Sequence, residues 1–125
     1  MDIAILGYGV VGSGVAEVIS LNECKITGKI GEKMNVKYIL DLRKFPGDKN
    51  EDKIIDDFNI ILNDGDVKIV AEAMGGLHPA FEFVSSCLKA GKSVVTSNKE
   101  LVAEKGDILL ELAKENNVNF MFEAS

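Results

Sequence analysis

The residues with the clearest chemical signature are four glycines near the start of the chain. They follow a short apolar run and fit the pattern G-x-G-x-x-G within residues 7–14 (Gly-Tyr-Gly-Val-Val-Gly-Ser-Gly). Such glycines let the backbone approach a pyrophosphate, and the N–H groups of residues 9–12 point at it from the start of a helix. The pattern predicts a dinucleotide-binding turn; the plainer alternative is a turn that only connects strand to helix. The predicted contact residues are Gly7, Gly9, Val10, Val11, Gly12 and Gly14.

A second cluster, Asp41-Leu42-Arg43-Lys44, carries both signs of charge after the next apolar run. A carboxylate here accepts a hydrogen bond from the ribose 2′-hydroxyl of NAD, whereas arginine or lysine pairs with the 2′-phosphate of NADP. Asp41 stands farther from the glycines than the usual spacing of about 20 residues, and the segment 23–33 accounts for the excess. Because the two signals conflict, NADP is favoured only slightly and NAD stays usable. The alternative is that Arg43 and Lys44 form a solvated loop.

Two more polar or glycine-containing clusters follow apolar runs in the second half of the chain. Glycines there would let the ribose and nicotinamide approach the backbone, and the hydroxyl and amide groups would suit a carboxamide or a carbonyl substrate. Lys99 is the cation that could orient or polarise a substrate carbonyl or carboxylate. The alternative is helix capping by Ser97 or Asn98, with Lys99 in solvent. The clusters are Met74-Gly75-Gly76 and Thr96-Ser97-Asn98-Lys99.

Other residues that often do chemistry have plainer interpretations here. Glu72, inside an apolar strand, is expected to accept hydrogen bonds from neighbouring loop amides. Glu123 lies at the carboxyl end of a strand and is therefore expected near the ligand-binding cleft. His78 has no partner at metal-ligand spacing, so it is interpreted as a surface or capping residue. Cys24 and Cys87 are too far apart in sequence, and too few, to indicate a zinc site or a disulfide framework, so both are expected to be reduced and buried.

These clusters need a scaffold, and the hydrophobic pattern alternates between strands and helices. It predicts an α/β fold of the Rossmann type: a doubly wound, mainly parallel sheet with helices on both faces and strand order 3-2-1-4-5-6. Ligands bind beyond the carboxyl ends of such strands, where all four clusters fall. Glu51–Phe58 is weakly helical, and Ile60–Leu62 fits either a short strand or a helical turn. The predicted strands are Ile3–Leu6, Val36–Leu40, Val67–Ala73, Ser93–Thr96 and Val118–Phe122, and helices are expected over 10–19, from Pro79, and from 98 or 101 to 115.

Composition limits the size and the partners of the protein. The 125 residues suit one domain, 1–125. A formal charge of −6 and a pI near 4.8 argue against nucleic acid or an anionic membrane surface as a partner, because such binding needs clustered lysine and arginine. The sequence has neither the basic start of a signal peptide nor a transmembrane stretch. A cytoplasmic protein that binds small molecules is therefore expected.

Four blocks together resemble the N-terminal half of homoserine dehydrogenase, and the resemblance covers essentially the whole chain. The glycine turn is common to many dehydrogenases, whereas the spacing of the later blocks is much more specific. The blocks are the glycine turn at 7–14, Glu-Ala-Met-Gly-Gly at 72–76 with Pro-Ala at 79–80, Ala-Gly-Lys-Ser-Val-Val-Thr-Ser-Asn-Lys at 90–99, and Phe-Glu-Ala-Ser at 122–125.

The resemblance implies NAD(P)-dependent interconversion of L-homoserine and L-aspartate 4-semialdehyde, a step in threonine, methionine and isoleucine biosynthesis. It implies that residues 7–14 hold the pyrophosphate, 41–44 the adenosine ribose, and 74–76 and 96–99 the nicotinamide side. Glu123 matches a family position that contributes to a monovalent-cation site, such as one for sodium. The full-length enzyme is expected to be a homo-oligomer.

The family's substrate-binding and dimerisation domain has no counterpart in these 125 residues. The chain is therefore expected to be a cofactor-binding part that is inactive alone. Two alternatives stay open: a non-catalytic nucleotide-sensing Rossmann module, and the cofactor half of another amino-acid or semialdehyde dehydrogenase.

Overall fold

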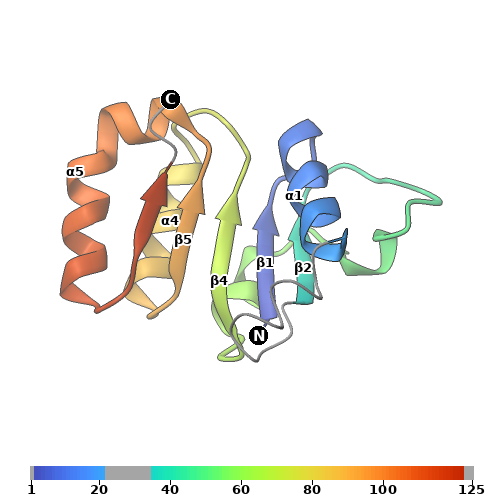
Figure 1. Ribbon diagram of the computed structural model, residues 1–125, viewed down its shortest axis with the longest axis horizontal. Coiled ribbons are helices and arrows are strands. Elements are labelled where there is room, and N and C mark those ends of the chain that lie inside the picture. Colours follow the sequence, from blue (N-terminus) through green and yellow to red (C-terminus); the bar gives the residue numbers. More distant parts are fainter. Residues whose placement is uncertain (1, 22–34, 123–125) are drawn as a thin grey trace.

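The computed structural model describes residues 2–21 and 35–122, with the side chains of 18–21 excluded. The expectations for Cys24, the segment 23–33 and Glu123 lie outside this part. Figure 1 shows the arrangement of the elements. The strands are β1 (Asp2–Leu6), β2 (Asn35–Leu40), β3 (Ile54–Ile55), β4 (Val67–Glu72), β5 (Ser93–Thr96) and β6 (Phe120–Phe122). The helices are α1 (Val10–Leu21), α3 (Phe58–Leu62), α4 (Ala80–Lys89) and α5 (Lys99–Glu115), with a 3-10 turn η1 (Glu51–Lys53).

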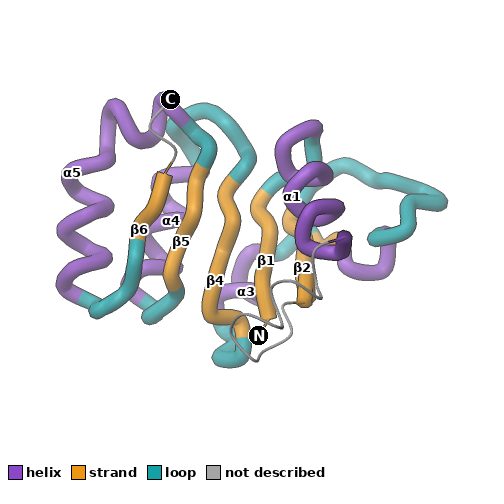
Figure 2. Tube along the Cα trace, in the orientation of Figure 1, coloured by secondary structure: helices purple, strands orange, loops and turns teal. Residues whose placement is uncertain are grey.

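The described strands form one six-stranded sheet in the order β3-β2-β1-β4-β5-β6 (Figure 2). Each neighbouring pair is parallel, so the predicted fold class and strand order are confirmed. The order reverses between β1 and β4, and a crevice forms at such a reversal because the connections leave in opposite directions. The carboxyl ends of β1, β2 and β4 therefore meet at one edge.

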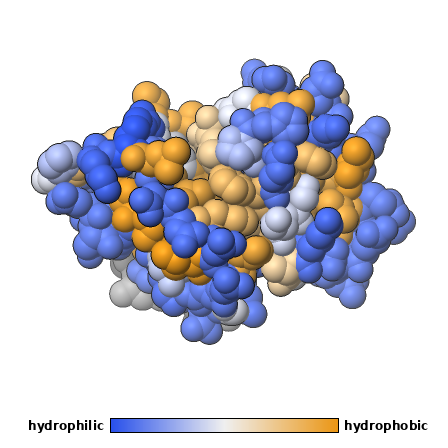
Figure 3. Space-filling view, turned by 180° about the vertical axis from the view of Figure 1, so that it is seen from behind, coloured by the Kyte–Doolittle hydropathy of each residue, from blue (hydrophilic) through white to orange (hydrophobic). Residues whose placement is uncertain are grey.

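Helices cover both faces of the sheet, which explains why β1 is apolar at successive positions rather than at alternate ones. Ala4 and Leu6 belong to the larger core, which includes Val84 and Leu88 of α4 and Leu109 of α5. Ile5, which points to the other face, packs in a smaller core with Ala16 of α1. Figure 1 shows α1 in front of β1 and β2, with α4 behind the sheet. Seen from behind, apolar side chains gather near the middle of the molecule, within a mainly hydrophilic surround (Figure 3).

The segment 51–62 differs from its prediction. The expected helix over Glu51–Phe58 is wrong beyond the 3-10 turn, because Ile54 and Ile55 pair with Ile39 and Leu40 as strand β3. The ambiguous residues 60–62 are helical and belong to α3. Asp57 caps α3 by accepting a hydrogen bond from the Asn59 N–H at 3.0 Å, so the helix begins only after strand β3.

Candidate functional site

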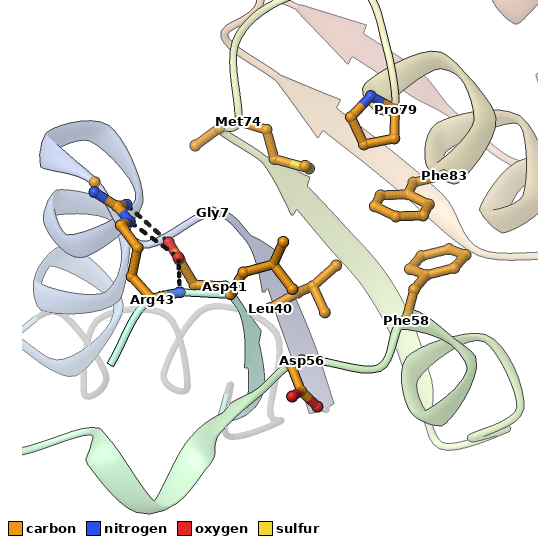
Figure 4. Close-up of a pocket in the computed structure, with 12 residues that line it drawn as sticks. Gly7, Leu40, Asp41, Arg43, Asp56, Phe58, Met74, Pro79 and Phe83 are labelled. Carbon is orange, nitrogen blue, oxygen red and sulfur yellow. Dashed lines mark hydrogen bonds and ion pairs between the residues drawn. The ribbon is translucent and has the colours of Figure 1, made fainter. Parts of the chain in front are cut away.

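A cavity of about 420 Å³ opens at the carboxyl ends of β1, β2 and β4. Gly7 and Gly9 form one wall, and the residues after β2, including Asp41 and Arg43, form another. Met74, which follows β4, closes the third side (Figure 4). Three of the four predicted clusters therefore contribute to one cavity, and it lies at the reversal of strand order.

The glycine turn is shaped by close backbone contacts. Gly7 has a φ of +97°, and a Cβ there would lie 3.1 Å from the carbonyl oxygen of Ala73. A Cβ at Gly12 would overlap the carbonyl oxygen of Gly7, so the third glycine of the pattern permits the helix to start against the strand. Gly9 lines the cavity. Since the first N–H groups of a helix have no intrahelical acceptor, those at the start of α1 are available to an anion beside Gly9.

Asp41 and Arg43 do not act as separate signals, because they form a bidentate ion pair (Figure 4). Arg43 donates from Nε at 3.0 Å and from Nη2 at 2.8 Å, and its backbone N–H adds a third bond at 2.9 Å. The Tyr8 N–H donates a fourth hydrogen bond to Asp41 at 2.9 Å, which ties the end of β2 to the glycine turn. These bonds hold the pKa of the Asp41 carboxyl well below its usual range.

The two partners differ in exposure. The Asp41 side chain is 8% exposed and that of Arg43 is 64% exposed. The Asp41 carboxylate therefore accepts hydrogen bonds from within the protein, while the Arg43 guanidinium keeps free N–H groups toward solvent and the cavity. Lys44 is also exposed and lines a neighbouring cavity of about 350 Å³ rather than the main one.

The polar residues after β4 and β5 form a buried network. Glu72 is 1% exposed and accepts hydrogen bonds from the Met74 N–H at 2.8 Å and from the Thr96 hydroxyl. The predicted role of Glu72 as an acceptor for loop amides is confirmed. Asn98 donates to the Gly76 carbonyl at 2.6 Å and caps α5 by accepting from the Leu101 N–H at 3.1 Å. Thr96 and Asn98 thus hold the loop that contains Met74, Gly75 and Gly76.

The other two residues of the cluster at 96–99 point outward. Ser97 and Lys99 are exposed, and Lys99 is the first residue of α5. The capping alternative is therefore realised at Asn98, while Ser97 and Lys99 remain free to meet a ligand along the same edge of the sheet.

The comparison with family models gives this arrangement its context. A model described as "Homoserine dehydrogenase, NAD binding domain" matches residues 7–123. The chain belongs to this family. The family resemblance predicted from the four sequence blocks is thereby confirmed.

Curated homoserine dehydrogenases agree along the whole chain. The enzyme of Bacillus subtilis (strain 168) is 35% identical over 126 residues, which are 98% of this chain and 29% of the relative. That of Lactococcus lactis subsp. lactis is 34% identical over 130 residues, which are 100% of this chain and 30% of the relative. The chain therefore spans about 30% of the length of these curated relatives.

Solved homoserine dehydrogenases share the fold. A crystal structure of the Staphylococcus aureus enzyme at pH 7.0 matches with a TM-score of 0.90 and 38% identity, covering 99% of this chain and 32% of that one. A hyperthermophilic archaeal homoserine dehydrogenase mutant, in complex with NADPH, matches with a TM-score of 0.78 and 28% identity over 98% of this chain and 43% of that one.

Some residues at the site of this NAD-binding domain escaped sequence reasoning. Phe58 and Phe83 line the cavity and stack on each other with ring centroids 4.2 Å apart (Figure 4). They come from α3 and α4, and the sequence pattern predicts only ordinary core positions for them. Tyr8 occupies a variable position of the glycine pattern, yet its ring is buried and its hydroxyl donates to Asp48 at 2.8 Å. No pattern within the sequence points to these contacts.

The remaining candidates agree with their plainer interpretations. His78 is exposed and its Nδ1 lies 2.7 Å from a carboxylate oxygen of Glu82. Cys87 is buried as a free cysteine, and burial raises the pKa of its thiol to about 12. Among residues 2–21 and 35–122, no group of three or more His, Cys, Asp and Glu side chains could hold a metal ion. No helix in that part is long and apolar enough to cross a membrane.

Proposed function

We propose that this chain is the cofactor-binding part of a homoserine dehydrogenase that interconverts L-homoserine and L-aspartate 4-semialdehyde with NADP(H), NAD(H) being usable as well. The observation that carries the proposal is a glycine-walled cavity at the reversal of strand order, in a chain of the homoserine dehydrogenase family. When bound, the nicotinamide cofactor supplies or accepts the hydride. The protein contributes binding, orientation and charge.

The turn fits a pyrophosphate because its backbone leaves room where a side chain would intrude. The N–H groups at the start of α1 donate to it, and residues 41–44 hold the adenosine ribose. We assign the 2′-phosphate to Arg43, supported by its exposed guanidinium and by the internal use of the Asp41 carboxylate. The NADPH complex of the archaeal relative agrees with this preference.

On the nicotinamide side, the predicted residues have two roles according to their exposure. The buried Thr96 and Asn98 position the loop of residues 74–76, which approaches the cofactor through its backbone. The exposed Ser97 and Lys99 meet the carboxamide and the substrate, with Lys99 orienting or polarising the reacting carbonyl.

A cytoplasmic location is also part of the proposal. The family resemblance alone adds a full-length enzyme that is a homo-oligomer and a monovalent cation such as sodium near Glu123.

The first test is cofactor binding by the 125-residue chain, measured by titration calorimetry with NADPH and NADH. We expect both to bind and NADPH to bind more tightly, and 2′,5′-ADP to compete better than 5′-AMP because it keeps the 2′-phosphate. If neither dinucleotide binds, the assignment of the cavity is wrong. If the adenine nucleotides bind as tightly as the dinucleotides, the site senses adenine nucleotides rather than serving a hydride-transfer enzyme.

Turnover gives a second readout on the same sample. We expect no oxidation of NADPH with L-aspartate 4-semialdehyde, because the chain spans only about 30% of the length of the curated relatives it matches. Measurable turnover would contradict that expectation.

A further inference from the structure

The guanidinium of Arg43 belongs to a closed series of contacts among four residues that begins and ends at Tyr8. The Tyr8 N–H donates to Asp41, and Asp41 accepts two bonds from the Arg43 guanidinium. The Arg43 Cζ lies 5.3 Å from the centroid of the Phe45 ring. The ring of Phe45 meets that of Tyr8 edge-on, with centroids 5.0 Å apart and planes at 86°.

The Phe45 ring supports Arg43 in a way that Asp41 cannot. Asp41 holds one edge of the guanidinium by hydrogen bonds, whereas the Phe45 ring, over which Cζ lies, adds a cation–π attraction from another direction. The segment that carries both residues has no helix or strand between Leu40 and Glu51. It is held instead by its own contacts, among them the hydrogen bonds from Tyr8 to Asp48 and from Asn50 to Tyr8.

Phe45 is placed to act on Arg43 and not on a bound cofactor. Arg43 lines both the main cavity and its smaller neighbour, while Phe45 lines only the smaller one. On the main-cavity side, a Cβ at Gly9 would lie 3.8 Å from Nη2 of Arg43, so the guanidinium stands directly beside the glycine turn. The Arg43 guanidinium thus lies over Phe45, and its free N–H groups are beside the place proposed for the adenosine phosphate.

We propose that Phe45 is a positioning residue that sets the preference for NADPH over NADH by holding the Arg43 guanidinium beside the 2′-phosphate. This inference rests on the proposed assignment of Arg43 to that phosphate. NADH has no 2′-phosphate, so its affinity does not depend on how well Arg43 is held. Loss of the Phe45 ring therefore changes the ratio of the two affinities, which a general loss of packing would leave alone.

The test compares dissociation constants for NADPH and NADH across variants of the 125-residue chain. Phe45→Leu is expected to weaken the binding of NADPH by about two- to fivefold, the range that corresponds to an exposed cation–π contact, and to leave the affinity for NADH unchanged. Phe45→Met, which fills the space without an aromatic face, should behave like Phe45→Leu. Phe45→Tyr, which keeps the ring, should restore the wild-type ratio.

Two controls distinguish a failure of the Phe45 role from a failure of the assignment of Arg43 to the 2′-phosphate. Phe83→Leu removes a ring that lines the main cavity, so it should weaken both cofactors equally. Arg43→Ala should weaken NADPH selectively, and adding Phe45→Leu to it should cause no further loss.

If Arg43→Ala weakens both cofactors equally, the 2′-phosphate assignment itself fails. If Arg43→Ala is selective but Phe45→Leu and Phe45→Met both leave the ratio unchanged, Arg43 binds the phosphate without help from Phe45 and the inference is overturned. Circular dichroism spectra of each variant identify any that do not fold, and the ratio is then read from the folded member of the Leu and Met pair. If neither folds, the ring serves the fold rather than cofactor choice, and the inference is equally overturned.

Discussion

A Cβ atom at Gly12 would overlap the carbonyl oxygen of Gly7, while a Cβ at Gly14 would meet no described atom within 4 Å. Both glycines lie in α1 and both belong to the same run of small residues. The structure therefore gives them different tasks. Gly12 permits the close approach of helix and strand, and Gly14 is a helix position that pays only the entropic cost of glycine.

This difference predicts opposite effects of the same substitution. Gly12→Ala should lower the free energy of unfolding by about 1–3 kcal/mol, as expected for overpacking. It should also weaken the binding of NADPH, because the turn must shift. Gly14→Ala should raise the free energy of unfolding by up to about 1 kcal/mol, because alanine favours a helix. Urea unfolding measures both. If Gly12→Ala were as stable as Gly14→Ala, the turn would tolerate the added atom and the prediction would be wrong.

The pair Asp41 and Arg43 marks how far the sequence could predict the site. Residue types and spacing placed both at the adenosine end, and the structure puts both on the cavity. In the sequence they are rival signals for NAD and NADP, since a sequence does not show that two side chains pair with each other. The contacts of Phe45 and Tyr8 were unpredictable for the same reason: they depend on how the irregular segment between Leu40 and Glu51 packs.

Among the elements, β3 was the hardest to predict. A strand of two residues carries no periodicity of its own, and Ile54 and Ile55 also fit the apolar side of a short helix. Their conformation is decided by pairing with Ile39 and Leu40, which is tertiary information. Longer elements such as α5 carry enough repeats of the 3.6-residue period to be recognised from sequence alone.

The start of α5 couples helix stability to the shape of the loop after β4. Asn98 uses its side-chain oxygen to cap the helix at Leu101 and its side-chain nitrogen to hold the Gly76 carbonyl. These two bonds can be separated, because a serine hydroxyl is long enough to cap but too short to reach across to Gly76.

Asn98→Ala should therefore lower the free energy of unfolding by about 0.5–2 kcal/mol, the usual range for a lost N-cap. Asn98→Ser should recover most of that stability. Both variants should weaken NADPH, because neither holds the loop at Gly76. Thermal or urea unfolding gives the first effect and calorimetric titration the second. Full recovery of cofactor binding in Asn98→Ser would show that the cap alone matters.

At the scale of the whole molecule, the alternation of strands and helices sufficed to predict the fold class, and the strand order was inferred from that fold class. It did not reveal a polar cluster at the opposite end of the sheet from the cavity. There Asp64, between α3 and β4, accepts hydrogen bonds from Tyr38 at 2.7 Å and forms an ion pair with Lys37 at 2.6 Å. The buried Lys92 donates to its backbone carbonyl at 2.7 Å. The cluster links β2, β4 and β5, which are distant in sequence.

This cluster gives the fold a predictable dependence on acid. The hydrogen bonds from Lys37 and Tyr38 hold the pKa of Asp64 well below its usual range. A carboxyl whose pKa is lowered by folding stabilises the folded state above its unfolded pKa of roughly 4, and that contribution is lost as the pH falls toward the folded value. Asp64→Asn should therefore be less stable than the wild type at pH 7, and the difference should shrink steadily below about pH 4.

Urea unfolding at a series of pH values measures this difference directly. Asp66→Asn is the matched control, because Asp66 joins the cluster through its backbone N–H and not through its carboxyl; its curve should run parallel to that of the wild type. A gap between Asp64→Asn and the wild type that stays constant down to pH 2 would mean that Asp64 acts through packing alone. Because the cluster lies across the sheet from the cavity, the Asp64→Asn variant should keep its NADPH affinity at pH 7. The acid dependence of stability would then arise at the opposite end of the six strands from cofactor binding.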